Sequence, residues 1–446
     1  MFNKILIANR GEIAVRIIHA CRELGISTVA VYSEADRESL HVQIADEAIC
    51  IGPKEVAKSY LNMKSIIAAC EITGATAVHP GCGFLAENSK FAKMVQACGL
   101  KFIGPSVNSI DILGDKIKAK RLVRQVGVPV VSGSNGPVAD VNEALKVARE
   151  IGYPIIIKAK AGGGGKGIRV VQSAEEVESA FSLSKSEARL YFGDDEVYIE
   201  KFIENPRHVE VQILADEHGN YIHLGERDCS VQRRNQKLIE EAFSPAVDVN
   251  LRKKLGDAAV KVAKACKYFN AGTVEFLLDK NKNFYFMEVN TRVQVEHGIT
   301  ELVTGVDIVK AQIKIAANKK LNINQKNLNF NGHSIECRIN AEIPEKGFMP
   351  SPGRIEELYI PCGNGIRVDH AIYSGYTIPP YYDNMIAKLM VYDTNRKEAI
   401  YKMISALAEF IVSGIHTNID FQLKILRNRD FRNGNVDIGF LSRLQY

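Results

Sequence analysis

Apolar residues fall in short runs over roughly the first 110 positions of the chain. Four of these runs have the composition of buried strands, at 4–8, 27–32, 75–78 and 101–103. Between the first two runs, apolar residues from Ile13 to Leu24 recur every three or four positions, which predicts a helix that Gly25 ends. This alternation of strand and helix predicts a doubly wound, mostly parallel sheet.

A second pattern begins at Asp115, whose side chain can cap a lysine-rich helix. Strands are predicted in this part of the chain at 154–158, 196–200, 209–215, 273–278 and 284–290. A helix is predicted at 249–267, and 132–137 has the composition of a hinge or turn. After the polar stretch 322–331, a third unit mixes strands at 333–340 and 354–359 with a helix at 396–410. The expected class is α/β and α+β, in three units at 1–114, 115–330 and 331–446.

Chain length, net charge and cysteine content limit the number of domains, the binding partners and the cellular location that we expect. At about 150 residues a domain, a chain of 446 residues suggests two or three domains. The net charge of +5, from 57 basic and 52 acidic residues, is too small a bias to indicate nucleic-acid binding. Nine cysteines without a CxxC pair are typical of a reduced, intracellular protein. The apolar run 5–8 is too short for a signal peptide, and no run approaches the roughly 20 residues of a membrane span. We therefore expect a cytoplasmic protein without a membrane segment.

A glycine-rich loop at 162–167 directly follows a predicted strand that ends in Lys158. Glycines let backbone amides approach an anion closely, and Lys158 and Lys166 add positive charge. The loop is not a Walker A motif, because glycine rather than Ser or Thr follows Lys166. A flexible surface turn is the alternative, but the strand ending in lysine favours a mobile lid over phosphate groups.

Polar residues occupy every second position from Glu288 to Glu296. If this segment is extended, its acidic, amide and Arg side chains share one face. Glu275, on the preceding predicted strand, can lie beside Glu288 in a hairpin. Two carboxylates and an amide oxygen are ligands that suit Mg²⁺. The alternative is an ordinary exposed strand, but such a strand would more often carry Lys and Thr.

Two further segments carry candidate chemistry. The segment 226–237 concentrates basic, amide and acidic residues that suit an anion, although the following Glu240 and Glu241 favour a charged surface loop. The segment 79–84 follows a strand of the first unit, where ligands bind in open sheets. Within it, Cys82 by itself indicates only a buried structural cysteine.

Together these motifs resemble biotin carboxylase, the ATP-grasp component of biotin-dependent carboxylases. The resemblance covers essentially the whole chain and rests on IANRGEI at 7–13, HPG at 79–81, the loop at 162–167, NPRHVE at 205–210, ERDC at 226–229, QRR at 232–234, EVNTRVQVEH at 288–297, ECRINAE at 336–342 and PPYYD at 379–383. It implies an N-terminal doubly wound sheet, a central ATP-grasp unit with a lid at about 131–204, and a C-terminal mixed α+β domain. The implied reaction carboxylates biotin with bicarbonate while ATP is cleaved to ADP and phosphate.

The resemblance also implies a role for individual residues. For ATP, it implies phosphate contacts from Lys116, Lys158, Gly164 and Gly165, adenine contacts from Glu200, Lys201 and Ile203, and ribose contacts from His208 and Gln232, with Asn235 close by. For Mg²⁺ or Mn²⁺, it implies Glu275, Glu288 and Asn290. For bicarbonate, it implies Lys237, Arg292, Gln294 and the Val295 backbone, with Glu296 as general base. For biotin, it implies Arg338, which can stabilise the deprotonated ring, and the position of Cys82.

Several residues depart from the family pattern. Cys82 stands where tyrosine is usual, Asn235 where histidine is common, and Lys160–Ala161 where Ser-Gly precedes the lid. Gly298 and Phe243 stand where prolines are usual. Because the catalytic positions are intact, we expect these departures to affect affinity and lid motion before activity.

Partners follow from the same resemblance. The sequence has no Ala-Met-Lys-Met biotin-attachment motif, so we expect biotin to arrive on a separate biotin carboxyl carrier protein and the carboxyltransferase to be separate. A homodimer is expected. The favoured interpretation is the first half-reaction of acetyl-CoA carboxylase in fatty acid synthesis. The alternatives are a component of a pyruvate, propionyl-CoA or other acyl-CoA carboxylase, or a catalytically inactive relative, against which Lys237, Arg292, Glu296 and Arg338 argue.

Overall fold

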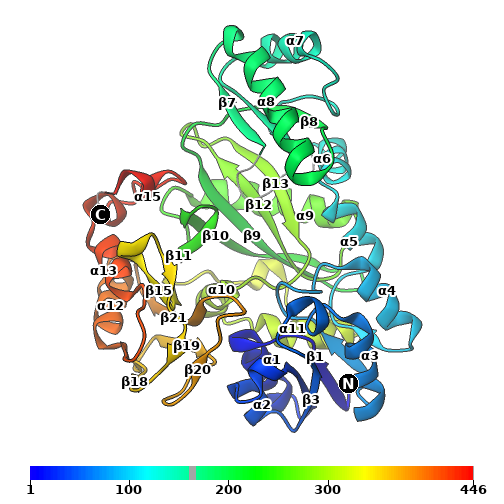
Figure 1. Cartoon of the computed structure of the whole chain (residues 1–446), viewed down its shortest axis with the longest axis vertical. Coiled ribbons are helices and arrows are strands. Elements are labelled where there is room, and N and C mark those ends of the chain that lie inside the picture. The colour runs from blue at the N-terminus through cyan, green and yellow to red at the C-terminus, as the bar shows by residue number, and fades with distance from the viewer. Residues whose placement is uncertain (160–166, 445–446) are drawn as a thin grey trace.

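The N-terminal part of the chain forms a five-stranded, entirely parallel sheet (Figure 1). The structure is a computed structural model that describes residues 1–159 and 167–444. The strands, in spatial order, are β3 (Glu47–Gly52), β2 (Ser27–Ser33), β1 (Lys4–Ile7), β4 (Ala77–His79) and β5 (Lys101–Phe102). The helices are α1 (Gly11–Glu23), α2 (Leu40–Ile44), α3 (Met63–Thr73), α4 (Ser89–Ala97) and α5 (Val107–Gly114).

Alternate residues of β1 enter two different hydrophobic cores, as a sheet covered on both faces requires. Ile5 and Ile7 pack with the apolar face of α1, whereas Leu6 packs with residues of α3 and α4. The expected doubly wound sheet is confirmed. Its edge strand β3 is one that the apolar pattern does not reveal, because only Ile51 of that strand is buried.

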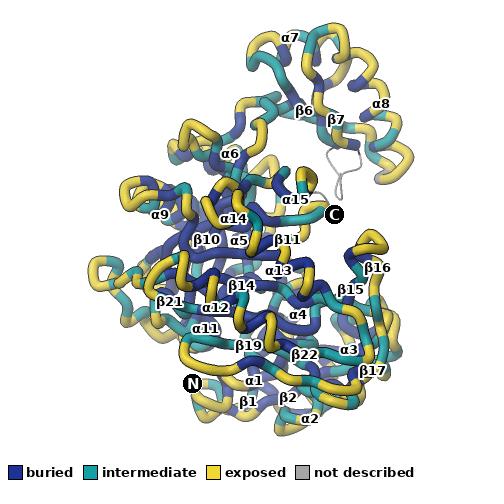
Figure 2. Tube along the Cα trace, turned by 90° about the vertical axis from the view of Figure 1, so that its left-hand side faces the viewer, coloured by how far each residue is buried: buried dark blue, intermediate teal, exposed yellow. Residues whose placement is uncertain are grey.

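An eight-stranded antiparallel sheet occupies the middle of the molecule. Its order is β13 (Phe284–Asn290), β12 (Asn270–Leu278), β9 (Arg207–Ala215), β10 (Tyr221–Arg233), β11 (Gln236–Ala242), β14 (His333–Asn340), β21 (Met385–Asp393) and β19 (Ile366–His370). Helices α9 (Val249–Ala265), α10 (His297–Thr304) and α11 (Ile308–Ala316) pack against it. Hydrogen bonds between β11 and β14 carry the sheet across the predicted boundary near residue 330. Figure 2 shows these strands as the most continuously buried part of the chain.

A small separate unit stands at one end of the molecule (Figures 1 and 2). It contains the three-stranded sheet β7 (Ile168–Val171), β6 (Ile155–Ala159) and β8 (Val197–Lys201), with α7 (Val141–Ile151) and α8 (Ala174–Phe192). The unit has its own hydrophobic core, which includes Ile157 and Ile199. Helix α6 (Lys116–Gln125) leads into it, and Asp115 caps that helix by accepting hydrogen bonds from the amides of Ile117 and Lys118, as predicted.

The C-terminal part adds short ribbons and helices around β14, β21 and β19. The ribbons are β15 (Glu342–Ile343) with β16 (Met349–Pro350), β17 (Gly353–Arg354) with β20 (Thr377–Ile378), and β18 (Leu358–Tyr359) with β22 (Ile411–Val412). The helices are α12 (Arg396–Glu409), α13 (Ile419–Arg427), α14 (Arg429–Arg432) and α15 (Phe440–Arg443). The single strand predicted at 354–359 is therefore wrong, because β17 and β18 pair with different partners. None of the helices in the described ranges could cross a membrane by its length and hydrophobicity.

Candidate active site

The predicted acidic hairpin is present. Strands β12 and β13 are antiparallel neighbours, and their register places Glu275 directly opposite Glu288. Asn290, at the end of β13, donates a 2.8 Å hydrogen bond to Oε1 of Glu275. The Lys116 ammonium, at the start of α6, lies 3.6 Å from Glu288. Two carboxylates and an amide oxygen at one end of a hairpin form the kind of oxygen donor set that Mg²⁺ prefers, so these residues fit the expected metal.

Strand β13 ends at Asn290, as predicted for 284–290, so the polar residues from Thr291 to Glu296 do not continue the strand. The physical reason is Glu87, which lies outside the sheet, in the segment before α4. Its carboxylate accepts the amide of Thr291 at 2.8 Å and Nε of Arg292 at 2.8 Å, and these contacts replace the next hydrogen bonds of the ladder. Arg292 also donates to Oε1 of Gln294 at 2.5 Å and to Oδ1 of Asn290 at 3.1 Å.

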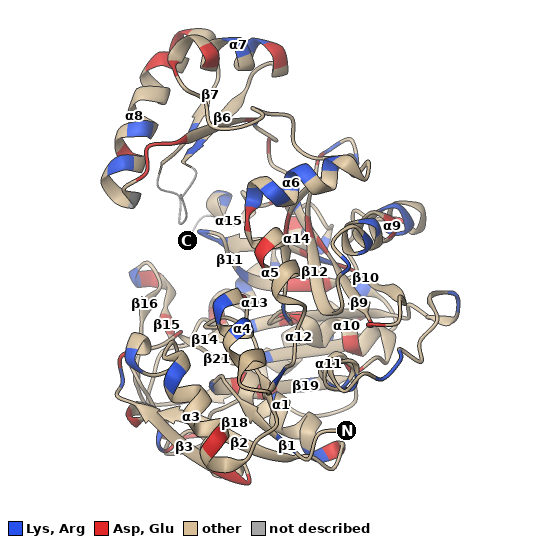
Figure 3. Cartoon of the chain, turned by 90° about the vertical axis from the view of Figure 1, so that its right-hand side faces the viewer, with Lys and Arg blue, Asp and Glu red and all other residues tan. Residues whose placement is uncertain are grey.

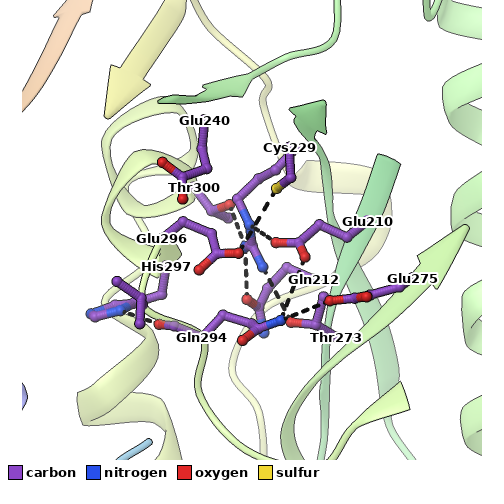
Figure 4. A network of polar contacts seen from close by, with 12 residues as sticks. Glu210, Gln212, Cys229, Glu240, Thr273, Glu275, Gln294, Glu296, His297 and Thr300 are labelled. Atoms are coloured by element: carbon purple, nitrogen blue, oxygen red, sulfur yellow. Dashed lines mark hydrogen bonds and ion pairs between the residues drawn. The ribbon is translucent and has the colours of Figure 1, made fainter. Parts of the chain in front are cut away.

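Lys237 occupies the centre of the acidic cluster. Its ammonium lies 2.6 Å from Glu210, 2.6 Å from Glu296 and 3.2 Å from Glu275. Burial by itself would lower the pKa of Lys237, but the thiol of Cys229 and these carboxylates outweigh that effect and raise it. Lys237 shares these carboxylates with two other cations, because Arg227 also pairs with Glu210 and Arg338 with Glu296. Figure 4 shows that the side chains of Glu210, Glu275, Gln294 and Glu296 lie in one polar network.

Glu296 is held between two cations. Its Oε1 accepts from Lys237, and its Oε2 lies 3.1 Å from the guanidinium of Arg338. Burial would raise the pKa of Glu296, but Lys237 and Arg338 outweigh it and hold the pKa well below its ordinary range. Arg338 also donates a 2.6 Å hydrogen bond from Nε to Glu240, whose pKa burial raises to about 7. The carboxylate of Glu296 is therefore ionised at neutral pH.

The residues implied for the nucleotide are divided between the small unit and the central sheet. Lys158 on β6 contacts Glu200 on β8 at 2.8 Å, and Lys120 of α6 contacts the other oxygen of Glu200. Figure 3 shows the row of Lys and Arg along α6. Lys201 donates to the carbonyl of Tyr153 at 2.6 Å, and Ile203 follows two residues later.

The ribose candidates lie on the central sheet. His208 on β9 contacts Glu275 at 3.0 Å. Gln232, one residue before the end of β10, lies opposite Lys237. Asn235 adopts a left-handed conformation with φ of +65° in the turn between β10 and β11. Gly164 and Gly165, together with Lys160 and Ala161, lie outside the described residues.

Cys82 lies in the loop after β4, and its carbonyl accepts a 2.8 Å hydrogen bond from Asn9 of the IANRGEI motif. Burial and the nearby Glu12 raise the pKa of its thiol to about 11. The thiol is therefore protonated at neutral pH and offers a small, weakly polar group.

The segment 226–237 is a strand and a turn rather than a charged surface loop. Arg227 has no exposed surface and donates to Glu210 at 2.6 Å and to Gln212 and Thr300 at 2.9 Å each. Glu240 and Glu241 are also buried. The sequence assigned no supporting role to Glu87, Arg227 or Glu240, because their partners lie on other segments of the chain.

Three family profiles together match most of the chain. They are the biotin carboxylase N-terminal domain at residues 1–110, the ATP-binding domain of the carbamoyl-phosphate synthase L chain at 115–324, and the biotin carboxylase C-terminal domain at 336–443.

Individual relatives match over nearly their whole length. The chain is 57% identical over 442 residues to Biotin carboxylase 1 of Bacillus subtilis, covering 99% of this chain and 98% of that protein. It is 52% identical to a pyruvate carboxylase subunit of Methanothermobacter thermautotrophicus, covering 99% and 90%. A solved structure, the biotin carboxylase domain dimer of Hydrogenobacter thermophilus 2-oxoglutarate carboxylase with MgADP, ADP and bicarbonate, matches with a TM-score of 0.92 and 50% identity, covering 99% and 97%.

Proposed function

The chain belongs to the biotin carboxylase family, whose ATP-grasp enzymes form a carbon–nitrogen bond with cleavage of ATP, and we propose that this protein carboxylates biotin held on a separate carrier protein, with bicarbonate as the carbon source. The products are carboxybiotin, ADP and phosphate. The observation that carries the proposal is the position of Glu296, ionised and held between Lys237 and Arg338.

Bicarbonate is a poor nucleophile until its proton leaves. We assign its binding to Lys237, Arg292, Gln294 and the backbone of Val295, next to the carboxylate of Glu296. When bicarbonate binds beside Lys237 and Arg338, its negative charge offsets their effect on Glu296, so the pKa of Glu296 rises towards its ordinary range. Glu296 then accepts the proton of bicarbonate. The resulting oxyanion attacks the γ-phosphorus of ATP, which gives carboxyphosphate and ADP.

The nucleotide and metal complete that step. Lys116 and Lys158 would bind phosphate oxygens, and Lys158 would exchange its contact with Glu200 for the nucleotide. Glu275, Glu288 and Asn290 would hold Mg²⁺ or Mn²⁺, which neutralises charge on the phosphates when bound. Glu200, Lys201 and Ile203 would border the adenine, and His208, Gln232 and Asn235 the ribose.

The phosphate that leaves carboxyphosphate would take the proton of a ureido nitrogen of biotin. This nitrogen would then bond to the carboxyl carbon, whose bond to the phosphate oxygen has broken. Arg338 would stabilise the negative charge on the ureido oxygen while biotin is deprotonated, because a guanidinium remains charged throughout. Cys82 would border this site, where its small size leaves more room than the tyrosine of the family pattern.

We propose a separate carrier because this chain covers 98% of the Bacillus subtilis relative, which is named as a biotin carboxylase. We place the activity in acetyl-CoA carboxylase and fatty acid synthesis, beside a separate carboxyltransferase. The Methanothermobacter relative favours pyruvate carboxylase as the second candidate. The Hydrogenobacter domain is a dimer, which supports a homodimer here. Nine free thiols support the reducing cytoplasm.

The test is ADP release by the purified protein with Mg-ATP and bicarbonate, with and without free biotin. We expect turnover that requires bicarbonate and increases with biotin. Glu288→Lys should abolish it, because a cation then replaces a metal ligand. Glu71→Lys, the same charge reversal at an exposed position of α3, is the matched control and should retain activity. An unsubstituted protein that is inactive even with a biotinylated carrier would refute the proposal.

A further inference from the structure

Lys388 is a lysine with no exposed surface, in the middle of β21. Its ammonium donates a 2.7 Å hydrogen bond to the carbonyl of Val295, the residue immediately before Glu296. It also lies 3.2 Å from Glu12 of α1 and 3.7 Å from Asp369 of β19. Burial by itself would lower the pKa of Lys388, but Glu12, Glu336 and Asp369 raise it, so the side chain is charged. No role described above uses this residue.

The sheet register places Lys388 beside a residue of the active site. Arg338 on β14 lies directly opposite Lys388, and Asp369 lies opposite it on the other side. Side chains directly opposite one another in an antiparallel pair point to the same face, so the two cations are neighbours. Like charges in that position repel, and the carboxylates of Glu240 and Glu12 offset the repulsion between the two cations. The two cations contact consecutive residues, since Arg338 binds the side chain of Glu296 and Lys388 binds the carbonyl of Val295.

The segment from Thr291 to Glu296 needs such support, because it lies between the end of β13 and the start of α10 and belongs to no strand or helix. Side chains hold it instead. Glu87 accepts the amide of Thr291 at one end, and Lys388 binds the carbonyl of Val295 at the other. The Val295 carbonyl shares its peptide plane with the amide of Glu296, so a hydrogen bond to this carbonyl fixes one of the two peptide planes that flank the Cα of Glu296.

We propose that Lys388 is a positioning residue for catalysis, which fixes the Val295–Glu296 peptide so that the Glu296 carboxylate faces Lys237 and the bicarbonate site. Through Glu12, the same ammonium ties this peptide to the N-terminal unit, and through Asp369 it ties the peptide to the C-terminal strands. All three parts of the chain therefore meet at the residue before the general base. The inference rests on the proposed function, because it gives Lys388 a role only in bicarbonate activation.

Lys388→Met tests it, since methionine keeps the length of the side chain and removes its charge and donor. We expect kcat for bicarbonate-dependent ADP release to fall by about 10²-fold, the usual effect of misplacing a catalytic group by about 1 Å. KM for bicarbonate should rise, whereas KM for ATP should stay unchanged, because the nucleotide residues lie elsewhere. A purely structural role would lower the melting temperature without this split between the two substrates.

Two further variants make the result decisive. Lys402→Met removes another lysine that donates to a main-chain carbonyl, that of Tyr392 at 2.8 Å, and should leave both KM values and kcat unchanged. Glu12→Gln combined with Lys388→Met removes the buried carboxylate left without its partner and should fold while keeping the kinetic defect. The proposal is overturned if the folded double variant has the unsubstituted kcat/KM for bicarbonate, or if neither variant folds, because the lysine then serves the fold alone. Inactivity of the unsubstituted protein would instead refute the proposed function.

Discussion

Glu241 ties the central sheet to the C-terminal helices, and its removal gives a measurable prediction. Its carboxylate is 3% exposed and accepts hydrogen bonds from His333 at 2.8 Å and from Nε and Nη2 of Arg396 at 2.7 and 2.9 Å. Arg396 in turn donates to the carbonyls of Phe431 and Arg432. We therefore expect Glu241→Gln to loosen β11, β14, α12 and α14 together.

The magnitude follows from the pKa of Glu241. Burial would raise this pKa, but the hydrogen bond from His333 and the charge of Arg396 lower it from 4.5 to about 2. A depressed carboxyl pKa stabilises the folded state above the unfolded pKa, and that stabilisation is lost as the pH falls through the folded pKa. The difference between 4.5 and about 2 corresponds to about 3 kcal/mol at pH 7.

Urea unfolding followed by circular dichroism measures this quantity. At pH 7, Glu241→Gln should lower the free energy of unfolding by about 3 kcal/mol. The deficit should shrink once the pH falls below 4.5 and vanish near pH 2, where the wild-type carboxyl is itself protonated. Glu409→Gln, at an exposed position of α12, is the matched control. A deficit no larger than that of Glu409→Gln at pH 7, or one that is unchanged at pH 3, would refute the reasoning.

Three other substitutions probe the site. Lys237→Met should lower kcat by about 10²-fold or more, because the cation nearest the general base is lost. The affinity for ATP, measured by titration with a fluorescent nucleotide, should stay unchanged. A normal kcat would contradict the role of Lys237. Glu87→Gln should raise KM for bicarbonate more than KM for ATP in steady-state assays, because an amide replaces the carboxylate that orients Arg292. Equal changes in the two KM values would argue against that role. Gly298→Ala should destabilise the protein by about 1–3 kcal/mol in thermal unfolding, despite the better helix propensity of alanine, since the new Cβ would lie 2.3 Å from the sulfur of Met390. Met390→Ala in the same chain should remove part of that loss, and an additive result would exclude the clash.

Local sequence patterns predicted those features that depend on neighbours in the chain. The β12–β13 hairpin brings Glu275 and Glu288 together because both strands are strongly apolar and a short polar turn separates them. The cap at Asp115 depends only on the two amides that follow it.

The features that were missed depend on partners far away in the chain. Glu240 and Glu241 have the composition of a surface loop when considered locally. Their partners Arg338 and Arg396 lie 98 and 155 residues later. The pairing of β11 with β14 brings Arg338 close, and the packing of α12 on β14 brings Arg396 close. Similarly, Glu87 ends the extended run after Asn290 from a position 204 residues before Thr291, and no period in the sequence indicates this contact.

Because the sheet continues from β11 to β14, the ATP-binding region is hard to produce as a separate fragment. A fragment that stopped near residue 330 would leave β11 as a bare edge, with its amide and carbonyl groups open to pairing with another polypeptide. It would also leave Glu240 and Glu241 without the guanidinium groups of Arg338 and Arg396. A recombinant ATP-binding fragment would therefore tend to aggregate. Fusions or reporter insertions are better placed in an exposed turn, such as that around Lys282, than at the boundary between the family profiles.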